Sequence, residues 1–150
     1  MADDLSMPSL LRGGCHCGCL QVEFATRLSP TGINPWACDC SFCRKHGAAY
    51  LSDPVGRLRI VASSATALLT YRQGSEAARF QLCGRCGVLV AVTYMHAGSL
   101  FGAVNAGCLD PSIALGPRVV ASPQLLGPEQ KIDRWLQLWV PDVELVVARA

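Results

Sequence analysis

Short runs of β-branched, aromatic and other apolar residues recur along the chain, separated by turn-forming residues. Runs of this length that are bounded by glycine, proline or small polar residues are typical of β-strands. Nine prolines and fourteen glycines separate the runs. The pattern predicts strands at residues 21–25, 58–62, 68–72, 78–82, 88–94 and 100–105.

Helical periodicity is clear only near residues 129–138, with a weaker indication at 41–46. Trp135 and Trp139 lie four residues apart, so we expect them on one helix face, packed on the core. The length of 150 residues suits one domain, and neither an internal repeat nor a long polar linker divides it. We therefore predict a single mainly-β domain over residues 13–150, preceded by a flexible leader at residues 1–12.

Residues 88–109 carry no Lys, Arg, Asp or Glu over a length that could span a bilayer. The stretch is, however, interrupted by Gly98 and Gly102, and by the polar residues Thr93, His96 and Asn105. A break at residues 94–99 separates two runs of β-branched or aromatic residues. We therefore predict two buried strands joined by a turn and no association with a membrane.

Composition narrows the class of protein further. The chain is 51% hydrophobic and 16% charged, which argues against intrinsic disorder. The net charge of +2 provides no basic stripe, so we expect no nucleic-acid partner. The first twelve residues carry Asp3 and Asp4 where a secretory signal needs positive charge, and they have no sustained apolar core. This favours a cytoplasmic protein.

Nine cysteines are the most informative feature of the composition. A disulfide framework is disfavoured in a cytosolic chain, and an odd number of cysteines would leave one unpaired. Seven of them fall into clusters whose spacing suits metal ligation: Cys15-x-Cys17, Cys38-x-Cys40-x-x-Cys43 and Cys83-x-x-Cys86. The other two, Cys19 and Cys108, we interpret as small core residues.

The first and last clusters together provide four thiolates. The segment from Cys83 to Gly87 has the form of a zinc knuckle, in which glycines let the backbone bend around the sulfurs. Cys15 and Cys17 would share one side of an extended backbone. Four thiolates make a closed tetrahedral site, so we predict a structural zinc bound by these four cysteines.

The middle cluster, Cys38, Cys40 and Cys43, has one ligand fewer than a closed tetrahedron. Three ligands with an open fourth position are typical of a zinc ion that binds substrate or water, although His46 could close the site instead. Three thiolates make zinc a weak Lewis acid, which disfavours hydrolysis and favours binding of a substrate thiol, hence chemistry at sulfur. Thiolate ligands would also suit iron.

The ordered motifs resemble those of the glutathione-dependent formaldehyde-activating enzyme family, which also includes centromere protein V. The resemblance rests on residues 13–18 (Gly-Gly-Cys-His-Cys-Gly), on 38–44 (Cys-Asp-Cys-Ser-Phe-Cys-Arg), and on Phe80 with 83–87 (Cys-Gly-Arg-Cys-Gly). It implies a β-tent fold with two zinc ions, one structural at Cys15, Cys17, Cys83 and Cys86, and one catalytic at Cys38, Cys40 and Cys43.

The same resemblance implies a carbon–sulfur lyase that forms S-hydroxymethylglutathione from glutathione and formaldehyde. The thiol would become the fourth ligand of the second zinc. Arg44 and Arg85, which lie next to cysteine ligands, would either bind the carboxylates of glutathione or offset thiolate charge.

Two other functions remain open. A non-catalytic zinc-binding interaction module would have no free coordination position and no affinity for thiols. A methionine sulfoxide reductase of a related zinc fold would bind zinc with two C-x-x-C pairs, whereas here one pair is C-x-C and a three-cysteine cluster lies between the pairs. Asp39, Cys19 and Cys108 depart from the more usual family residues, and the match weakens after Asp110, which leaves the substrate open. The sequence does not decide the oligomeric state.

Overall fold

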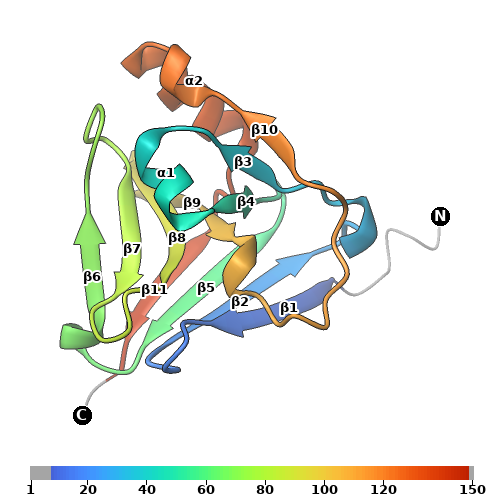
Figure 1. Cartoon of the computed structure of the whole chain (residues 1–150), viewed down its shortest axis with the longest axis vertical. Coiled ribbons are helices and arrows are strands. Elements are labelled where there is room, and N and C mark those ends of the chain that lie inside the picture. Colours follow the sequence, from blue (N-terminus) through green and yellow to red (C-terminus); the bar gives the residue numbers. More distant parts are fainter. Residues whose placement is uncertain (1–7, 149–150) are drawn as a thin grey trace.

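Two β-sheets form the framework of this computed structural model, which describes residues 8–148 (Figure 1). The smaller sheet has four strands in the spatial order β1-β2-β5-β11, of which β5 and β11 are parallel and the other neighbours antiparallel. Its strands are β1 (Ser9–Gly14), β2 (Leu20–Thr26), β5 (Arg57–Ala62) and β11 (Val143–Val147).

The larger sheet has seven strands in the order β10-β3-β4-β9-β8-β7-β6, and only β10 and β3 pair in parallel. These strands are β3 (Trp36–Cys38), β4 (Ala49–Leu51), β6 (Leu68–Tyr71), β7 (Arg79–Cys83), β8 (Leu89–His96), β9 (Ser99–Asn105) and β10 (Val119–Ala121).

Two α-helices, α1 (Ser41–His46) and α2 (Pro128–Leu138), accompany the sheets. Short 3₁₀ helices occur in the connections: η2 (Pro30–Gly32), η3 (Ala65–Ala67), η4 (Ala106–Cys108) and η5 (Pro123–Leu125). Both α-helices agree with the helices that periodicity predicted. No helix within residues 8–148 has the length and hydrophobicity needed to cross a membrane.

The uncharged stretch at residues 88–109 forms the β8–β9 hairpin, as predicted. Its turn places Ala97 at φ 49° and Gly98 at φ 84°, and positive φ at both turn positions suits the twist of a tight hairpin. Val90, Ala91, Ala103 and Val104 are fully buried in it, which accounts for the lack of charge.

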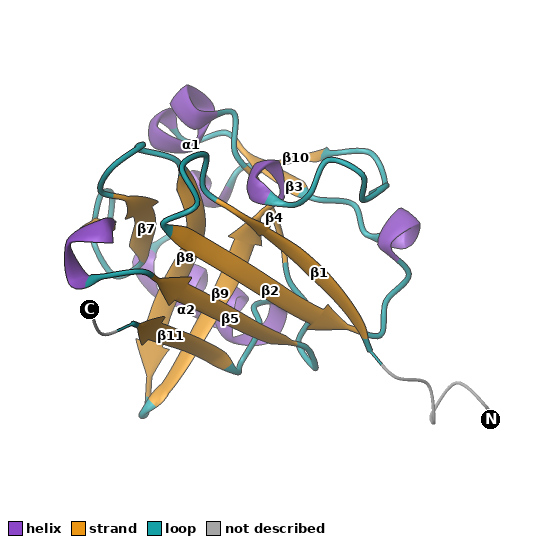
Figure 2. Ribbon diagram, turned by 90° about the horizontal axis from the view of Figure 1, so that it is seen from below, coloured by secondary structure: helices purple, strands orange, loops and turns teal. Residues whose placement is uncertain are grey.

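Two apolar clusters lie in the fold. The first fills the space between the sheets, where Phe24 and Ile60 of the smaller sheet meet Val90 and Val104 of the larger one. Figure 2 shows the smaller sheet in front of the strands that it covers. The second cluster lies with α1 and α2 and contains Tyr50, Phe80, Trp135 and Trp139 together with Cys43. A cysteine cluster is thus embedded among aromatic side chains.

The mainly-β class predicted from the sequence is confirmed, and each predicted strand corresponds to one in the structure. The predicted flexible leader at residues 1–12 needs correction, because Ser9–Gly14 forms strand β1 and pairs with β2. Leu11 on this strand is 5% exposed, so burial of an apolar side chain holds the segment in place. Residues 1–7 lie outside the described residues.

Candidate metal centres

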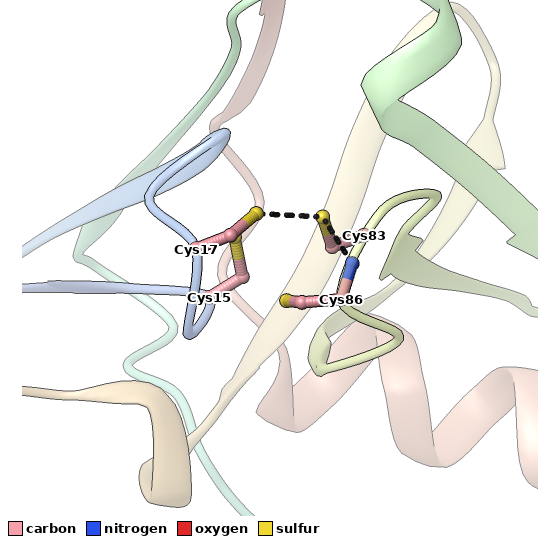
Figure 3. A group of neighbouring side chains, drawn as sticks. All are labelled: Cys15, Cys17, Cys83 and Cys86. Carbon is pink, nitrogen blue, oxygen red and sulfur yellow. Dashed lines mark hydrogen bonds between the residues drawn. The ribbon is translucent and has the colours of Figure 1, made fainter.

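The four cysteines predicted to form one site converge in the structure. Cys15 and Cys17 lie in the turn after β1, whereas Cys83 ends β7 and Cys86 lies in the following turn. Their sulfurs lie within 4.8 Å of one another, and all point toward a common centre (Figure 3). The Sγ atoms of Cys17 and Cys83 are 3.5 Å apart, and those of Cys15 and Cys17 are 3.7 Å apart.

Backbone N–H groups surround these sulfurs. The N–H of Leu20 donates to Cys15 Sγ at 3.2 Å, and those of Arg85 and Cys86 each donate to Cys83 Sγ at 3.3 Å. Gly84 permits this knuckle because an added Cβ would lie 2.5 Å from the carbonyl oxygen of Thr66. Such donors stabilise thiolates and orient them as ligands.

The four-cysteine group fits a zinc ion on its chemistry and spacing. Zn–S bonds of about 2.3 Å in a tetrahedron separate the sulfurs by about 3.8 Å, close to the distances seen here. Burial raises the pKa of Cys86, but donation from the N–H groups of Cys17 and Val88 outweighs it and brings the pKa down to about 6. A thiol that ionises easily is a ready metal ligand.

The second group consists of Cys38, Cys40 and Cys43, whose sulfurs also lie within 4.8 Å of one another. Cys38 ends β3, Cys40 is the N-cap of α1, and Cys43 lies in the first turn of that helix. The N–H of Cys43 donates to Cys40 Sγ at 3.4 Å, so the start of the helix itself brings two of the sulfurs together.

Two further side chains contact this group. Tyr50 places its hydroxyl 3.2 Å from Cys43 Sγ, and Gln73 Nε2 donates to Cys40 Sγ at 3.9 Å. Burial, followed by the nearby cysteine charges, raises the pKa of Tyr50 above its usual range. The tyrosine therefore stays protonated and can donate to a Cys43 thiolate.

The three thiols ionise unequally. Hydrogen bonding from Cys43 lowers the pKa of Cys38 to about 6, whereas that same bond and burial raise the pKa of Cys43. Without a metal, Cys38 and Cys43 therefore share one proton, which stays on Cys43. A bound cation would displace that proton. Three clustered sulfurs with one easily formed thiolate fit a metal ion that has a further ligand position to fill.

A cavity of about 310 Å³ adjoins this group, and all three cysteines line it. Aromatic side chains form much of its wall, and α2 contributes two cationic side chains, Lys131 and Arg134. None of the described residues that line the cavity is acidic. The three cysteines thus border a space large enough for an organic molecule.

The arginines predicted to bind carboxylates lie elsewhere. Arg44 and Arg85 are both exposed, and neither lines this cavity. The sequence reasoning missed Lys131 and Arg134, although their spacing from Trp135 places all three on one face of the predicted helix. His46 packs its ring against Phe42 at 4.7 Å and does not join the three sulfurs.

The two remaining cysteines join neither group. Cys108 is 6% exposed and donates to the carbonyl oxygen of Asn105 at 3.0 Å, as expected of a core residue. Cys19 is half-buried and packs against the core between the sheets.

Residues 10–122 match the family described as glutathione-dependent formaldehyde-activating enzyme. The chain belongs to this family. The match contains both cysteine groups, and it ends before α2. The resemblance predicted from the sequence motifs is therefore confirmed.

A solved structure is also similar to the chain. It is the crystal structure of a Rhodobacter sphaeroides protein, 28% identical in sequence, with a TM-score of 0.53. The similarity covers 72% of this chain and 99% of that one. No curated protein matches the chain.

Proposed function

We propose that this protein is a zinc-dependent enzyme of the carbon–sulfur lyase type that acts on a thiol adduct, such as S-hydroxymethylglutathione formed from glutathione and formaldehyde. The observation that supports it best is the position of Cys38, Cys40 and Cys43 on the wall of a cavity. Family membership supports the same chemistry. In this proposal, the protein binds a small-molecule thiol as its substrate and acts in the cytoplasm.

In the proposed reaction, the substrate sulfur attacks the carbonyl carbon of the aldehyde. A carbon–sulfur bond forms, the carbonyl double bond becomes a C–OH group, and the thiol proton ends on that oxygen. A zinc ion bound by the three cysteines would keep the substrate sulfur ionised at neutral pH without abolishing its nucleophilicity. No oxidant or reductant is needed.

The chain's own residues have separate roles in this proposal. Cys38, Cys40 and Cys43 would hold the metal on the wall of the cavity, where a substrate sulfur could reach it. The hydroxyl of Tyr50, 3.2 Å from Cys43 Sγ, would donate to the Cys43 thiolate and so moderate the charge on that ligand. Cys15, Cys17, Cys83 and Cys86 hold a second, structural zinc. Arg44 and Arg85 offset thiolate charge or reach substrate carboxylates from outside the cavity.

Replacing one cysteine of the three-cysteine group tests this function. We expect Cys40→Ser to lose about one zinc per chain and to reduce formation of S-hydroxymethylglutathione at least a hundredfold, while Cys19→Ser keeps both zincs and full activity. Elemental analysis and exchange NMR of the adduct measure the two quantities. Equal activity of the two variants would contradict the proposal and favour a non-catalytic zinc-binding module.

A further inference from the structure

Helix α2 forms one wall of the cavity beside Cys38, Cys40 and Cys43. It begins at Pro128, beyond the segment 10–122 that matches the family. Four side chains from α2 and its C-cap line the cavity: Lys131, Arg134, Trp135 and Trp139. The chemistry that α2 adds is therefore not given by the family match.

The apolar part of this wall is aromatic. The rings of Trp135 and Trp139 stack at 4.9 Å with an angle of 18°, and Trp135 also packs against Tyr94 at 5.2 Å. Trp36 and Phe80 add further rings to the lining. Formaldehyde has no apolar group to place against such a wall, whereas a bound aromatic or branched group would bury its surface there.

The cationic part consists of Lys131 and Arg134, both half-buried. Among residues 8–148, no carboxylate lies within ion-pair distance of either cation. A Cβ added at Gly74 would lie 4.0 Å from Lys131 Nζ, and the neighbouring Gln73 donates to Cys40. The lysine thus reaches across the cavity to the loop that contacts the three-cysteine group.

The segment that precedes α2 is hydrogen-bonded to Asp39, which lies in the loop that carries Cys38 and Cys40. Asp39, between two of the cysteines, accepts from Ser122 Oγ at 2.6 Å and from Gln124 Nε2 at 3.0 Å. The N–H of Asp39 also donates to the carbonyl oxygen of Ala121 at 2.9 Å. These bonds fix the start of the wall relative to Cys38 and Cys40.

We propose that the substrate of this site is the adduct between a carboxylate-bearing thiol and an aldehyde larger and more apolar than formaldehyde. Lys131 and Arg134 bind the carboxylates of the thiol, and Trp135 and Trp139 pack against the apolar group of the aldehyde. The inference rests on the proposed function, because it takes the sulfur to be activated at the three-cysteine group. The bond changes are those already described.

Aldehyde preference is measured on the zinc-loaded full-length protein. Glutathione is combined with propanal or with 3-phenylpropanal, which differ only in a terminal phenyl group, and with formaldehyde. Exchange NMR gives kcat/KM for formation of each adduct, after subtraction of the uncatalysed rate. We expect kcat/KM for 3-phenylpropanal to exceed that for both other aldehydes at least tenfold. Equal values, or a preference for formaldehyde, would overturn the aldehyde part of the proposal.

Thiol preference is tested with cavity variants. We expect Lys131→Ala and Arg134→Ala each to raise KM for glutathione about tenfold, and to leave KM for the neutral thiol 2-mercaptoethanol unchanged. The control Arg57→Ala removes one cation from β5, outside the cavity, and should change neither KM. Unchanged KM for glutathione in both cavity variants, or an equal rise for both thiols, would overturn the role of the cations.

These outcomes are separable from failure of the proposed function. If glutathione leaves the spectrum of the bound metal unchanged and no aldehyde exchanges faster than without protein, the proposed function fails and this inference fails with it. If exchange is catalysed but the expected preferences are absent, this inference alone is wrong.

Discussion

Cysteines of this chain differ in chemistry because of what lies within a few ångströms of each sulfur. Cys108 and Cys19 show this most simply, since neither belongs to a metal-binding group. Burial raises the pKa of Cys108 to about 12. Hydrogen bonding from Cys17 and Ser63 lowers the pKa of the more accessible Cys19 below its usual value.

These differences predict selective modification of the zinc-loaded protein. A thiol whose pKa is raised to about 12 carries almost no thiolate at pH 8, so iodoacetamide should leave Cys108 unmodified until the protein unfolds. Cys19, which is only half-buried and belongs to neither cysteine group, should react faster than Cys108 at the same pH. Peptide mass spectrometry reads both sites, and modification of Cys108 at the rate of Cys19 would show that its burial is misjudged.

At one glycine, a close approach of two backbones excludes a side chain. A Cβ on Gly13 would overlap the carbonyl oxygen of Cys108 and lie 2.5 Å from Leu109 Cα. We expect Gly13→Ala to lower the free energy of unfolding by about 2 kcal/mol or more. Gly32→Ala, where a Cβ meets nothing within 4 Å, is the control. Urea unfolding of both zinc-loaded variants measures the two free energies of unfolding. Equal values would contradict the close approach of Gly13 to Cys108 and Leu109.

Among the elements, η5 and the residue that precedes it are hydrogen-bonded to one side chain, that of Asp39, which lies between Cys38 and Cys40. Asp39 is the acceptor for Ser122 and Gln124, and its loss would leave these donors without their partner. We expect Asp39→Ala to lower the free energy of unfolding by about 1–2 kcal/mol.

The matched control for Asp39 is Asp142, whose pair with Arg57 at 3.0 Å is exposed. Asp142→Ala should change the free energy of unfolding by less than about 1 kcal/mol, because exposed ion pairs contribute little. Chemical denaturation compares the two variants. A larger effect at Asp142 would show that the hydrogen bonds of Asp39 do not hold η5 in place.

The elements also show which parts of the fold are readable from sequence. β8, β9 and α2 are long enough to show a period or a continuous apolar run, so the pattern predicted them. β3, β4 and β10 have three residues each, too few for a pattern to emerge. β11 pairs in parallel with β5, and the pairing of Leu58 with Val143 joins segments far apart in the chain.

The candidate site likewise has a part that could be predicted from the sequence and a part that could not. The ligand groups were predictable because metal geometry requires fixed local spacing, as in Cys83-x-x-Cys86. The cavity was not predictable, because Lys131 and Arg134 lie far from Cys40 in the sequence and line the same cavity only in the folded chain. Folding, rather than any local motif, places those cations near the sulfurs.

At the scale of the whole molecule, the two cysteine groups should differ in how much they contribute to stability. The four-cysteine group joins the turn after β1 to the end of β7 and so closes a long loop of chain. We expect Cys17→Ser to lower the thermal unfolding temperature by 10 °C or more, since binding energy of a structural zinc is folding energy.

Cys40→Ser should lower that temperature much less, because its group lies within one short segment, residues 38–43. Calorimetry of the two variants, each with its zinc content determined, gives the comparison. A larger loss of stability in Cys40→Ser would reverse the structural and catalytic assignments of the two groups.

The central claim is that the metal held by Cys38, Cys40 and Cys43 accepts a substrate thiol. X-ray absorption at the zinc edge, on protein of known metal content with and without glutathione, tests it most directly. The account predicts two zincs per chain and, on adding glutathione, an increase in the average number of sulfur ligands as one zinc gains a fourth. A single zinc per chain, or two zincs whose spectra do not respond to glutathione, would contradict it.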